Sequence, residues 1–130
     1  MGWWLMSAAW GATLQVVVAG VAHDDGTVRV WVADRSDAWL EPERAVASAE
    51  LSPSGTLRAA FELPAGDYAV WVVHDRNDNG SLDMRWLPYP RPAEPVAVSG
   101  DAQPVLGPPT FRGATVALVG DELVLSLELE

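Results

Sequence analysis

Apolar and polar residues alternate along most of this chain in short segments, a pattern typical of β-strands that bury one face. Glycine, proline, aspartate or serine residues separate the segments, as turns between strands require. Residues 45–50 could also form a helical turn, and no other segment favours a helix. The expected strands are residues 13–19, 27–33, 44–51, 56–63, 67–73, 114–119 and 123–129.

The end of the chain carries the clearest pattern. Leucines at every second position alternate with polar residues, so the leucines should face the core and the glutamates should face water. A turn at Gly120 and Asp121 predicts that the last strand forms a hairpin with residues 114–119. The inward residues are Leu123, Leu125, Leu127 and Leu129, and Glu128 is among the outward ones.

Seven of the ten prolines lie between Asp83 and Phe111. Proline lacks the N–H group that a central strand needs, so we expect an extended loop region there, in which residues 96–99 could add an edge strand. About seven antiparallel strands with few helices predict an all-β, two-sheet sandwich of the immunoglobulin-like or transthyretin-like kind. One domain is enough for a chain of 130 residues.

The charged side chains narrow the classes of partner. The chain has 18 acidic and eight basic side chains, a net charge of −10, no lysine and no cysteine. Nucleic acids and anionic membrane surfaces attract basic patches, so we expect neither as a partner. Without cysteine there is no disulfide, thiol nucleophile or cysteine-bound zinc. An acidic chain is better suited to cations.

Residues 1–12 contain no charged side chain and end in small residues, a composition typical of a secretory signal whose basic start is missing. We therefore expect a signal-peptide remnant at 1–12, a domain at 13–130, and export to the periplasm or the extracellular space. A membrane anchor is the alternative. The residues from Leu14 onward fit a strand better, however, which leaves too few for a span of about 20 residues.

The segment 74–83 reads HDRNDNGSLD and places side-chain oxygens at alternate positions before a glycine and a further carboxylate. Ca²⁺ takes about six to eight oxygen ligands, and alternating Asp and Asn residues in a tight turn direct their oxygens inward. Gly80 supplies the bend. Trp86 stands where an EF-hand has its bidentate glutamate, so this is a DxNxNGxxD loop between strands. The predicted ligands of a weak Ca²⁺ site are Asp75, Asn77, Asn79 and Asp83 side chains and the Ser81 carbonyl.

The loop and His74 allow three other interpretations. A plain polar turn also consists of Asn, Asp and Gly, but three alternating donors followed by glycine and aspartate exceed what a turn requires. His74 beside Asp75 could act as a catalytic base with Ser81 or Ser99 as nucleophile, yet the chain has no G-x-S-x-G motif. We expect His74 to orient the loop by hydrogen bonding. A zinc pair of His23 and His74 would lack a third ligand.

The seven tryptophans offer a second possible binding surface. Exposed rings can stack on sugars, so Trp39, Trp71 and Trp86 are candidate ligand-binding residues. Such rings more often cover a sheet and stay half-buried. Tyr68 follows Gly66 at a strand start, the position of a tyrosine corner, and its expected role is structural.

Three segments occur in a fixed order: LPAGDYAV at 63–70, the loop at 74–83, and GPPTFRGA at 107–114. Together they resemble a secreted bacterial family, domain of unknown function 2141, over nearly the whole chain after Ala12. The resemblance implies the fold and an exported location but no reaction. Family members usually carry EPYGFS where this chain has EPVAVS at 94–99, so any pocket that those two aromatics form is in doubt.

The sequence thus predicts an exported, Ca²⁺-stabilised β-sandwich that binds an unknown protein or glycan partner and is not an enzyme. A carbohydrate- or cell-surface-binding domain that uses the loop tryptophans is the second interpretation. A hydrolase-type enzyme around His74 is the third.

Overall fold

The computed structural model describes residues 11–78, 84–85, 91–92, 95–100 and 110–129, and for 84–85 and 91–92 it describes the backbone alone. The helical segments are the 3-10 turns η1 (Ser36–Ala38) and η2 (Pro42–Arg44) and the helix α2 (Phe111–Ala114). The strands are β1 (Gly11–Ala19), β2 (Thr27–Ala33), β3 (Ala47–Leu51), β4 (Leu57–Pro64), β5 (Gly66–Asp75), β6 (Met84–Arg85), β7 (Arg91–Pro92), β8 (Val96–Val98), β9 (Thr115–Leu118) and β10 (Glu122–Glu128).

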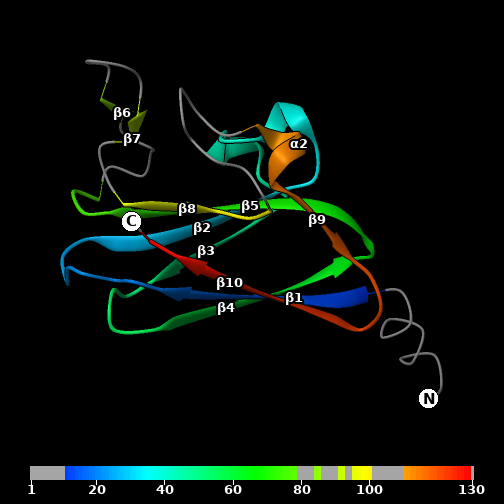
Figure 1. The fold of residues 1–130 in the computed structure, drawn as a ribbon, viewed down its shortest axis with the longest axis horizontal. Coiled ribbons are helices and arrows are strands. Elements are labelled where there is room, and N and C mark those ends of the chain that lie inside the picture. Colours follow the sequence, from blue (N-terminus) through cyan, green and yellow to red (C-terminus); the bar gives the residue numbers. More distant parts are fainter. Residues whose placement is uncertain (1–10, 79–83, 86–90, 93–94, 101–109, 130) are drawn as a thin grey trace.

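Two sheets lie face to face, and Figure 1 shows the three-stranded sheet below the five-stranded one. The three-stranded sheet has the order β10-β1-β4. The five-stranded sheet has the order β3-β2-β5-β8, and β9 pairs with another part of β5. Among the described strands only β1 and β10 pair in parallel. The prediction of an all-β, antiparallel, two-sheet sandwich is therefore confirmed, with the parallel pair of β1 and β10 as the exception.

Aliphatic side chains fill the space between the sheets. In β1 every second residue is buried, because a strand turns successive side chains to opposite faces. Strand β5 is buried on both faces over residues 68–75, so it runs through the middle of the molecule. The fully buried valines of this core are Val16, Val18, Val28, Val30, Val32, Val70 and Val72.

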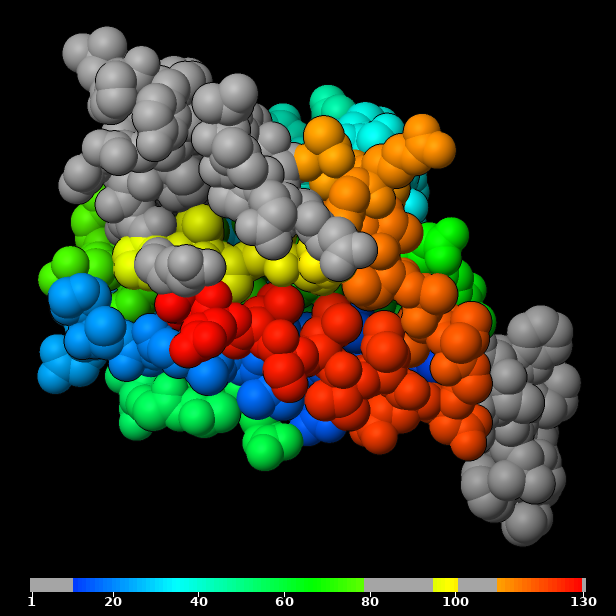
Figure 2. All heavy atoms as spheres, viewed as in Figure 1, coloured from blue at the N-terminus to red at the C-terminus, as the bar shows by residue number. Residues whose placement is uncertain are grey.

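The last two strands do not form the expected hairpin. Strand β9 pairs with β5, whereas β10 pairs with β1 in the other sheet, so the turn at Gly120 crosses between the sheets. A turn signal does not determine which strands pair, and the leucine face of β10 packs against the core from its place beside β1. The predicted facing holds: Leu129 is buried, Leu123, Leu125 and Leu127 pack partly buried against the core, and Glu128 is exposed. Strands β8 and β10 lie against each other on the side facing the viewer in Figure 2.

A second apolar layer covers the outer face of the five-stranded sheet. Trp31 of β2 and Trp71 of β5 are cross-strand neighbours on this face, and their rings stack with centroids 5.4 Å apart. Trp39, directly after η1, packs edge-on against Trp71 and against Phe111 of α2. The helical segments and this aromatic cluster thus form a cover over β5, which explains why β5 is buried on both sides.

Two local expectations need correction. Residues 45–50 form no helical turn; β3 occupies residues 47–51, and η2 ends just before it. The strand expected at 114–119 is preceded by α2, whose N-cap Thr110 accepts a hydrogen bond from the Gly113 N–H at 3.0 Å. One helical turn is too short to produce a periodic pattern, so no pattern in the sequence predicts α2.

Strand β1 begins two residues before the predicted domain start. Gly11 and Ala12 pair with Pro64 and Leu63 of β4, and Ala12 belongs to the core. The remaining residues of the expected signal segment, 1–10, lie outside the described residues. In the part of the chain that the structure describes, no helix has the length and apolar character needed to cross a membrane.

Candidate functional site

Strand β5 ends with two polar residues at one end of the sandwich. His74 pairs with Val28 and therefore shares the inner face with the core valines, while Asp75 pairs with Thr27 on the outer face. Both side chains are fully buried. Since an unpaired buried charge or polar group costs free energy, each needs partners close by. The candidate Ca²⁺ loop thus begins at a residue that the sheet already holds in place.

Arg29 of β2 is the partner of the Asp75 carboxylate. Its Nε donates to Asp75 Oδ2 at 2.8 Å, and its Nη1 lies 2.5 Å from Glu50 Oε2 on β3. Its Nη2 also lies 3.7 Å from Asp78 Oδ1. The hydrogen bond that Arg29 donates to Asp75 is the main cause that raises the pKa of Arg29; burial opposes the shift and Glu50 adds to it. The Arg29 guanidinium therefore lies within ion-pair distance of three carboxylates. Asp75 is buried, and Glu50 and Asp78 are exposed.

The chain turns immediately after β5. The Asp78 N–H donates to the Asp75 carbonyl at 3.3 Å, and Asp78 has a left-handed backbone with φ 56°. Aspartate tolerates this conformation better than most residues. The Thr27 hydroxyl donates to Asp78 Oδ1 at 2.6 Å, which fixes the turn against the start of β2.

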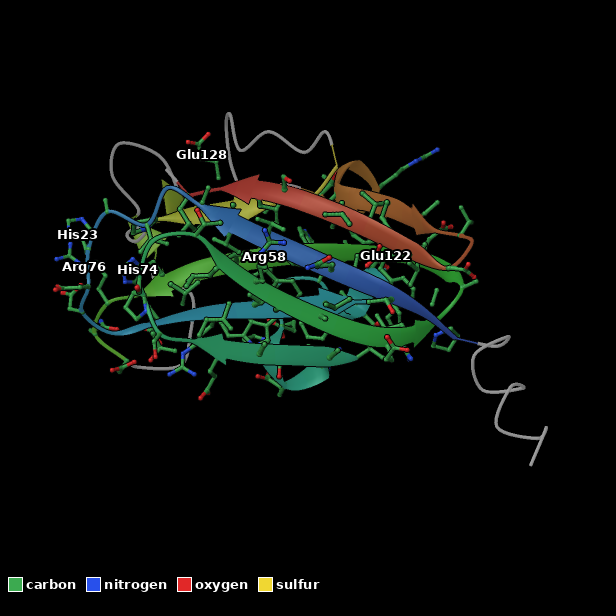
Figure 3. The ribbon with its side chains drawn as sticks, turned by 90° about the horizontal axis from the view of Figure 1, so that it is seen from below. His23, Arg58, His74, Arg76, Glu122 and Glu128 are labelled. Carbon is green, nitrogen blue, oxygen red and sulfur yellow. The ribbon has the colours of Figure 1, made fainter. Side chains whose placement is uncertain are left out.

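The loop between β1 and β2 packs against the same strand end, where Figure 3 places His23, His74 and Arg76 together. His74 Nε2 lies 2.7 Å from the Asp25 carbonyl and donates to it, because a carbonyl oxygen can only accept. His74 Nδ1 is buried and has no hydrogen-bond partner among the described residues. Arg76 Nε donates to Asp25 Oδ1 at 2.9 Å, and this bond is the main cause that lowers the pKa of Asp25.

Gly26 shows how closely the loop approaches β5. Its φ is +70°, and a Cβ atom at this position would lie 2.1 Å from the Asp75 carbonyl oxygen. No side chain fits there without moving the backbone. We expected His74 to orient the loop after β5 by hydrogen bonding. The hydrogen bond that the structure describes goes instead to Asp25, in the loop before β2.

The expected Ca²⁺ ligands are only partly described. Asp75 and Asn77 lie within the described residues, whereas Asn79, Ser81 and Asp83 lie outside them, as do Gly80 and Trp86. Among the described residues no three or more His, Asp or Glu side chains are grouped so that they could hold a metal ion. The Asp75 carboxylate is of the ligand type that suits a hard cation. The positive charge of Arg29 opposes a second cation.

A shallow open pocket of about 410 Å³ lies at the same end of the sandwich. It is bounded by the loop before β2 and the turn between β3 and β4. Its lining includes His23, Asp24 and Ser54 together with the apolar Val21 and Pro53. No local pattern in the sequence indicates this pocket, because two loops that are distant in the chain form it.

The candidate sugar-binding tryptophans differ in exposure. Trp71 is only 1% exposed, with Trp31 stacked on it and Trp39 against it edge-on at 5.2 Å, so it offers no ring face to solvent. Its Nε1 is buried and has no hydrogen-bond partner among the described residues. Trp39 is partly buried, and Trp86 lies outside the described residues.

Ser99 and Tyr68 make structural contacts. The Ser99 hydroxyl accepts from the Val70 N–H at 2.8 Å and donates to the Ala114 carbonyl at 2.6 Å, which ties β5 to α2 where β8 ends. The Tyr68 hydroxyl donates to the Pro64 carbonyl at 2.6 Å, the contact of a tyrosine corner. Burial is the main cause that raises the pKa of Tyr68, and the charge of Asp34 adds to it.

Arg29 and Glu50 were not among the residues singled out in the sequence. The available signal was an arginine within an otherwise apolar strand, on the same face as Trp31. Its pairing with Asp75 depends on which strands are neighbours and on their register, and both are non-local properties.

Comparison with known proteins gives one match. The model of a family described as an uncharacterized protein conserved in bacteria (DUF2141) matches residues 16–125. No curated protein and no solved structure matches the chain.

Proposed function

We propose that this chain, which belongs to the DUF2141 family of uncharacterized bacterial proteins, is an exported β-sandwich binding module, with a loop over residues 75–83 that binds Ca²⁺ weakly. Calcium binding stabilises the end of the sandwich where the loops before β2 and after β5 meet. The partner of the module is a protein or a glycan.

The fixed position of the Asp75 carboxylate carries this proposal. Asp75 is the first predicted ligand, and it sits fully buried at the end of a strand that is itself buried on both faces. A ligand held in advance loses little conformational freedom when an ion binds. Carboxylate and amide oxygens are the donors that Ca²⁺ prefers, and Asp75 and Asn77 supply both types at alternate positions.

Binding is favoured over catalysis because of what His74 and Ser99 do. His74 is buried and bonds the Asp25 carbonyl, and the Ser99 hydroxyl is engaged by two backbone groups. A hydrolase would need such groups to be free to reach a substrate. The burial of Trp71 likewise gives no support to a glycan surface built on that ring.

Export is supported by the composition of residues 1–12. The test is mass spectrometry of protein recovered from the periplasm or medium of a bacterial host that expresses the chain. We expect a mature protein that lacks Met1 and Trp3. A protein that remains in the cytoplasm with Met1 in place would contradict export.

Calcium binding is tested by thermal unfolding and titration calorimetry. Loops of this kind in extracellular proteins have dissociation constants of roughly 0.1–1 mM. At ~0.1 mM and with about 1 mM free Ca²⁺, linkage adds about 1.4 kcal/mol, a rise in Tm of about 4 °C. Asp75→Asn keeps the shape of the side chain and should abolish the rise.

Asp67→Asn is the matched control, because it makes the same substitution at the exposed opposite end of β5. It should leave the Ca²⁺-dependent rise intact. If neither the Tm nor the calorimetric heat of the unmodified protein responds to Ca²⁺ up to about 5 mM, the loop is a polar turn and the proposal is wrong.

A further inference from the structure

We propose that the outer face of the three-stranded sheet binds a second copy of this chain, face to face across a twofold axis. The inference goes beyond the proposed Ca²⁺ site, because it uses no residue of the loop after β5. It rests on the uncharged centre of this face and on two charged residues of β4, Arg58 and Glu62, which lie on either side of that centre.

The two sheets differ in what covers their outer faces. The aromatic cluster and the helical segments cover the five-stranded sheet. On the three-stranded sheet the outward side chains of β4 and β10 are exposed, and those of the middle strand β1 are half-buried between them. Figure 3 looks onto this face, and no described element lies over its three strands. The part of the chain that the structure describes therefore leaves this face open to a partner.

The centre of the face carries no charge. Strand pairing arranges the outward side chains in rows across the sheet, and the middle row consists of Ala60, Gln15 and Val124. Val124 is 49% exposed. Charged residues are depleted at the centre of protein interfaces. An uncharged row in a chain with a net charge of −10 therefore marks the middle of the docking surface.

The rows on either side of this middle row carry opposite charges on β4. One row consists of Glu62, Thr13 and Glu122, and the other consists of Arg58, Val17 and Ser126. Arg58 and Glu62 lie four residues apart on one strand, a distance of about 13 Å. Arg58 forms no ion pair with any residue that the structure describes. Its positive charge is therefore available to a partner.

A twofold axis along the middle row brings these charges together. It places each Arg58 opposite Glu62 of the second copy, so that two ion pairs form, and it places Glu122 opposite Ser126. Glu128 lies one row further out, at the rim. A twofold axis parallel to the strands would instead place Glu62 opposite Glu122, two like charges. Charge complementarity thus selects the axis across the strands.

The area of this face limits the strength of the dimer. The usual spacing of strands and residues gives a face of about 15 Å by about 20 Å. A face of this size is at the low end of specific interfaces, and the net charge of −10 on each copy opposes association. We therefore expect a dissociation constant on the order of 0.1 mM, so the dimer forms where the chain is concentrated.

Sedimentation equilibrium of the full chain measures this dimer. The samples span about 10 μM to about 1 mM protein in about 0.15 M NaCl, which screens the net charge. The unmodified protein should show a monomer–dimer equilibrium. Arg58→Glu replaces each ion pair between the copies by two carboxylates, so the dissociation constant should rise at least about tenfold. Glu62→Arg should have the same effect, because it brings two arginines together.

An equimolar mixture of Arg58→Glu and Glu62→Arg tests the twofold arrangement. In a mixed dimer each of the two charge contacts again joins an acidic and a basic side chain. The mixture should therefore dimerise within about threefold of the affinity of the unmodified protein, although neither variant does so alone.

The matched control is Arg112→Glu. Arg112 is exposed on α2, on the side of the five-stranded sheet, and makes no ion pair among the described residues. This variant changes the net charge by the same amount as Arg58→Glu, and its dissociation constant should stay within about twofold of the unmodified protein.

Glu62→Arg also removes the hydrogen bond that Glu62 accepts from the Thr13 hydroxyl, so circular dichroism checks its fold. If it does not fold, Val124→Asp takes its place. This variant puts two carboxylates on the twofold axis and should weaken the dimer at least about tenfold, because like charges repel. Val119→Asp is its control, since Val119 is 68% exposed in the turn after β9 and outside the face. Equal effects of these two variants would overturn the proposal.

Three further results would also overturn it. The first is a chain that stays monomeric at all these concentrations, because a second copy is then not the occupant of the face. The second is a dimer that Arg58→Glu weakens no more than Arg112→Glu does. The third is a mixture of folded Arg58→Glu and Glu62→Arg that stays monomeric although the unmodified protein forms dimers.

Discussion

The two faces of strand β2 differ in what they bury. On the inner face Val28, Val30 and Val32 belong to the aliphatic core between the sheets. On the outer face Arg29 pairs with a buried carboxylate, and Trp31 stacks on Trp71. Aliphatic packing tolerates substitutions that keep volume, whereas ion pairs and stacked rings depend on particular partners. The inner face therefore supplies the aliphatic core, and the outer face carries the contacts that depend on particular partners.

The largest effect should come from the outer face. Trp71→Ala removes the ring that joins Trp31 and Trp39, and we expect a loss of about 4 kcal/mol in the free energy of unfolding. Trp71→Phe keeps an aromatic ring and removes an indole N–H that has no partner among the described residues, so it should cost far less. Urea denaturation measures both. Similar losses for the two variants would contradict the role given to the ring.

The next effect tests how the outer layer is attached. Ser99→Ala leaves the Val70 N–H and the Ala114 carbonyl without their side-chain partner in a buried place. We expect a loss of about 3 kcal/mol. Ser99→Thr, which keeps the hydroxyl, should lose less. A loss below about 1 kcal/mol for Ser99→Ala would mean that water can enter between β5 and α2 and replace the hydroxyl.

On the inner face, Val30→Ala deletes two methyl groups from a fully buried position. We expect a loss of about 2 kcal/mol, smaller than that of Trp71→Ala, because fewer buried atoms are removed. Val30→Ile is the companion variant and tests whether the core has spare volume. If Val30→Ala cost more than Trp71→Ala, the outer layer would not be the more demanding face.

The smallest effect concerns Tyr68 at the far end of β5. Its pKa is raised in the folded protein above the ordinary value of 10.0, so the folded state holds the proton more tightly than the unfolded chain. The stability from this shift is present below pH 10 and is lost as the pH rises through the folded pKa. Tyr68→Phe should lose about 1 kcal/mol at neutral pH and show a shallower fall above pH 10. Equal slopes for both proteins in denaturation between pH 9 and 11 would contradict this.

Most strands of the sandwich and the facing of their side chains could be predicted, because both follow from the residue pattern within each segment. Alternation in β2 and β10 gave the correct facing of Val28, Val30 and the four leucines, since one buried face leaves a mark on every second residue. The hairpin prediction was wrong because partner choice depends on the whole sandwich. Leu123 lies beside Leu14, a residue more than a hundred positions earlier.

The contacts around the loop after β5 could likewise not be predicted from local sequence patterns. The alternating donors from Asp75 onward are visible in the sequence, but nothing local indicates that Arg29 bonds the first of them. That contact requires β2 and β5 to be neighbours and Thr27 to lie opposite Asp75. Likewise His74 contacts the Asp25 carbonyl because two distant segments end at the same edge. Sequence patterns identify candidate ligands, whereas their counter-charges follow from topology.

The parallel pairing of β1 with β10 has a consequence for the order of folding. Strand β1 is the middle strand of its sheet, and its neighbour β10 is synthesised after all the other described strands. A nascent chain that ends before residue 122 has Thr13 to Ala19 of β1 without their partners in β10. Contacts between such distant segments are slow to form. The three-stranded sheet is thus completed only after β10 has been synthesised, and a chain that lacks β10 keeps an open edge at β1 that chaperones can recognise.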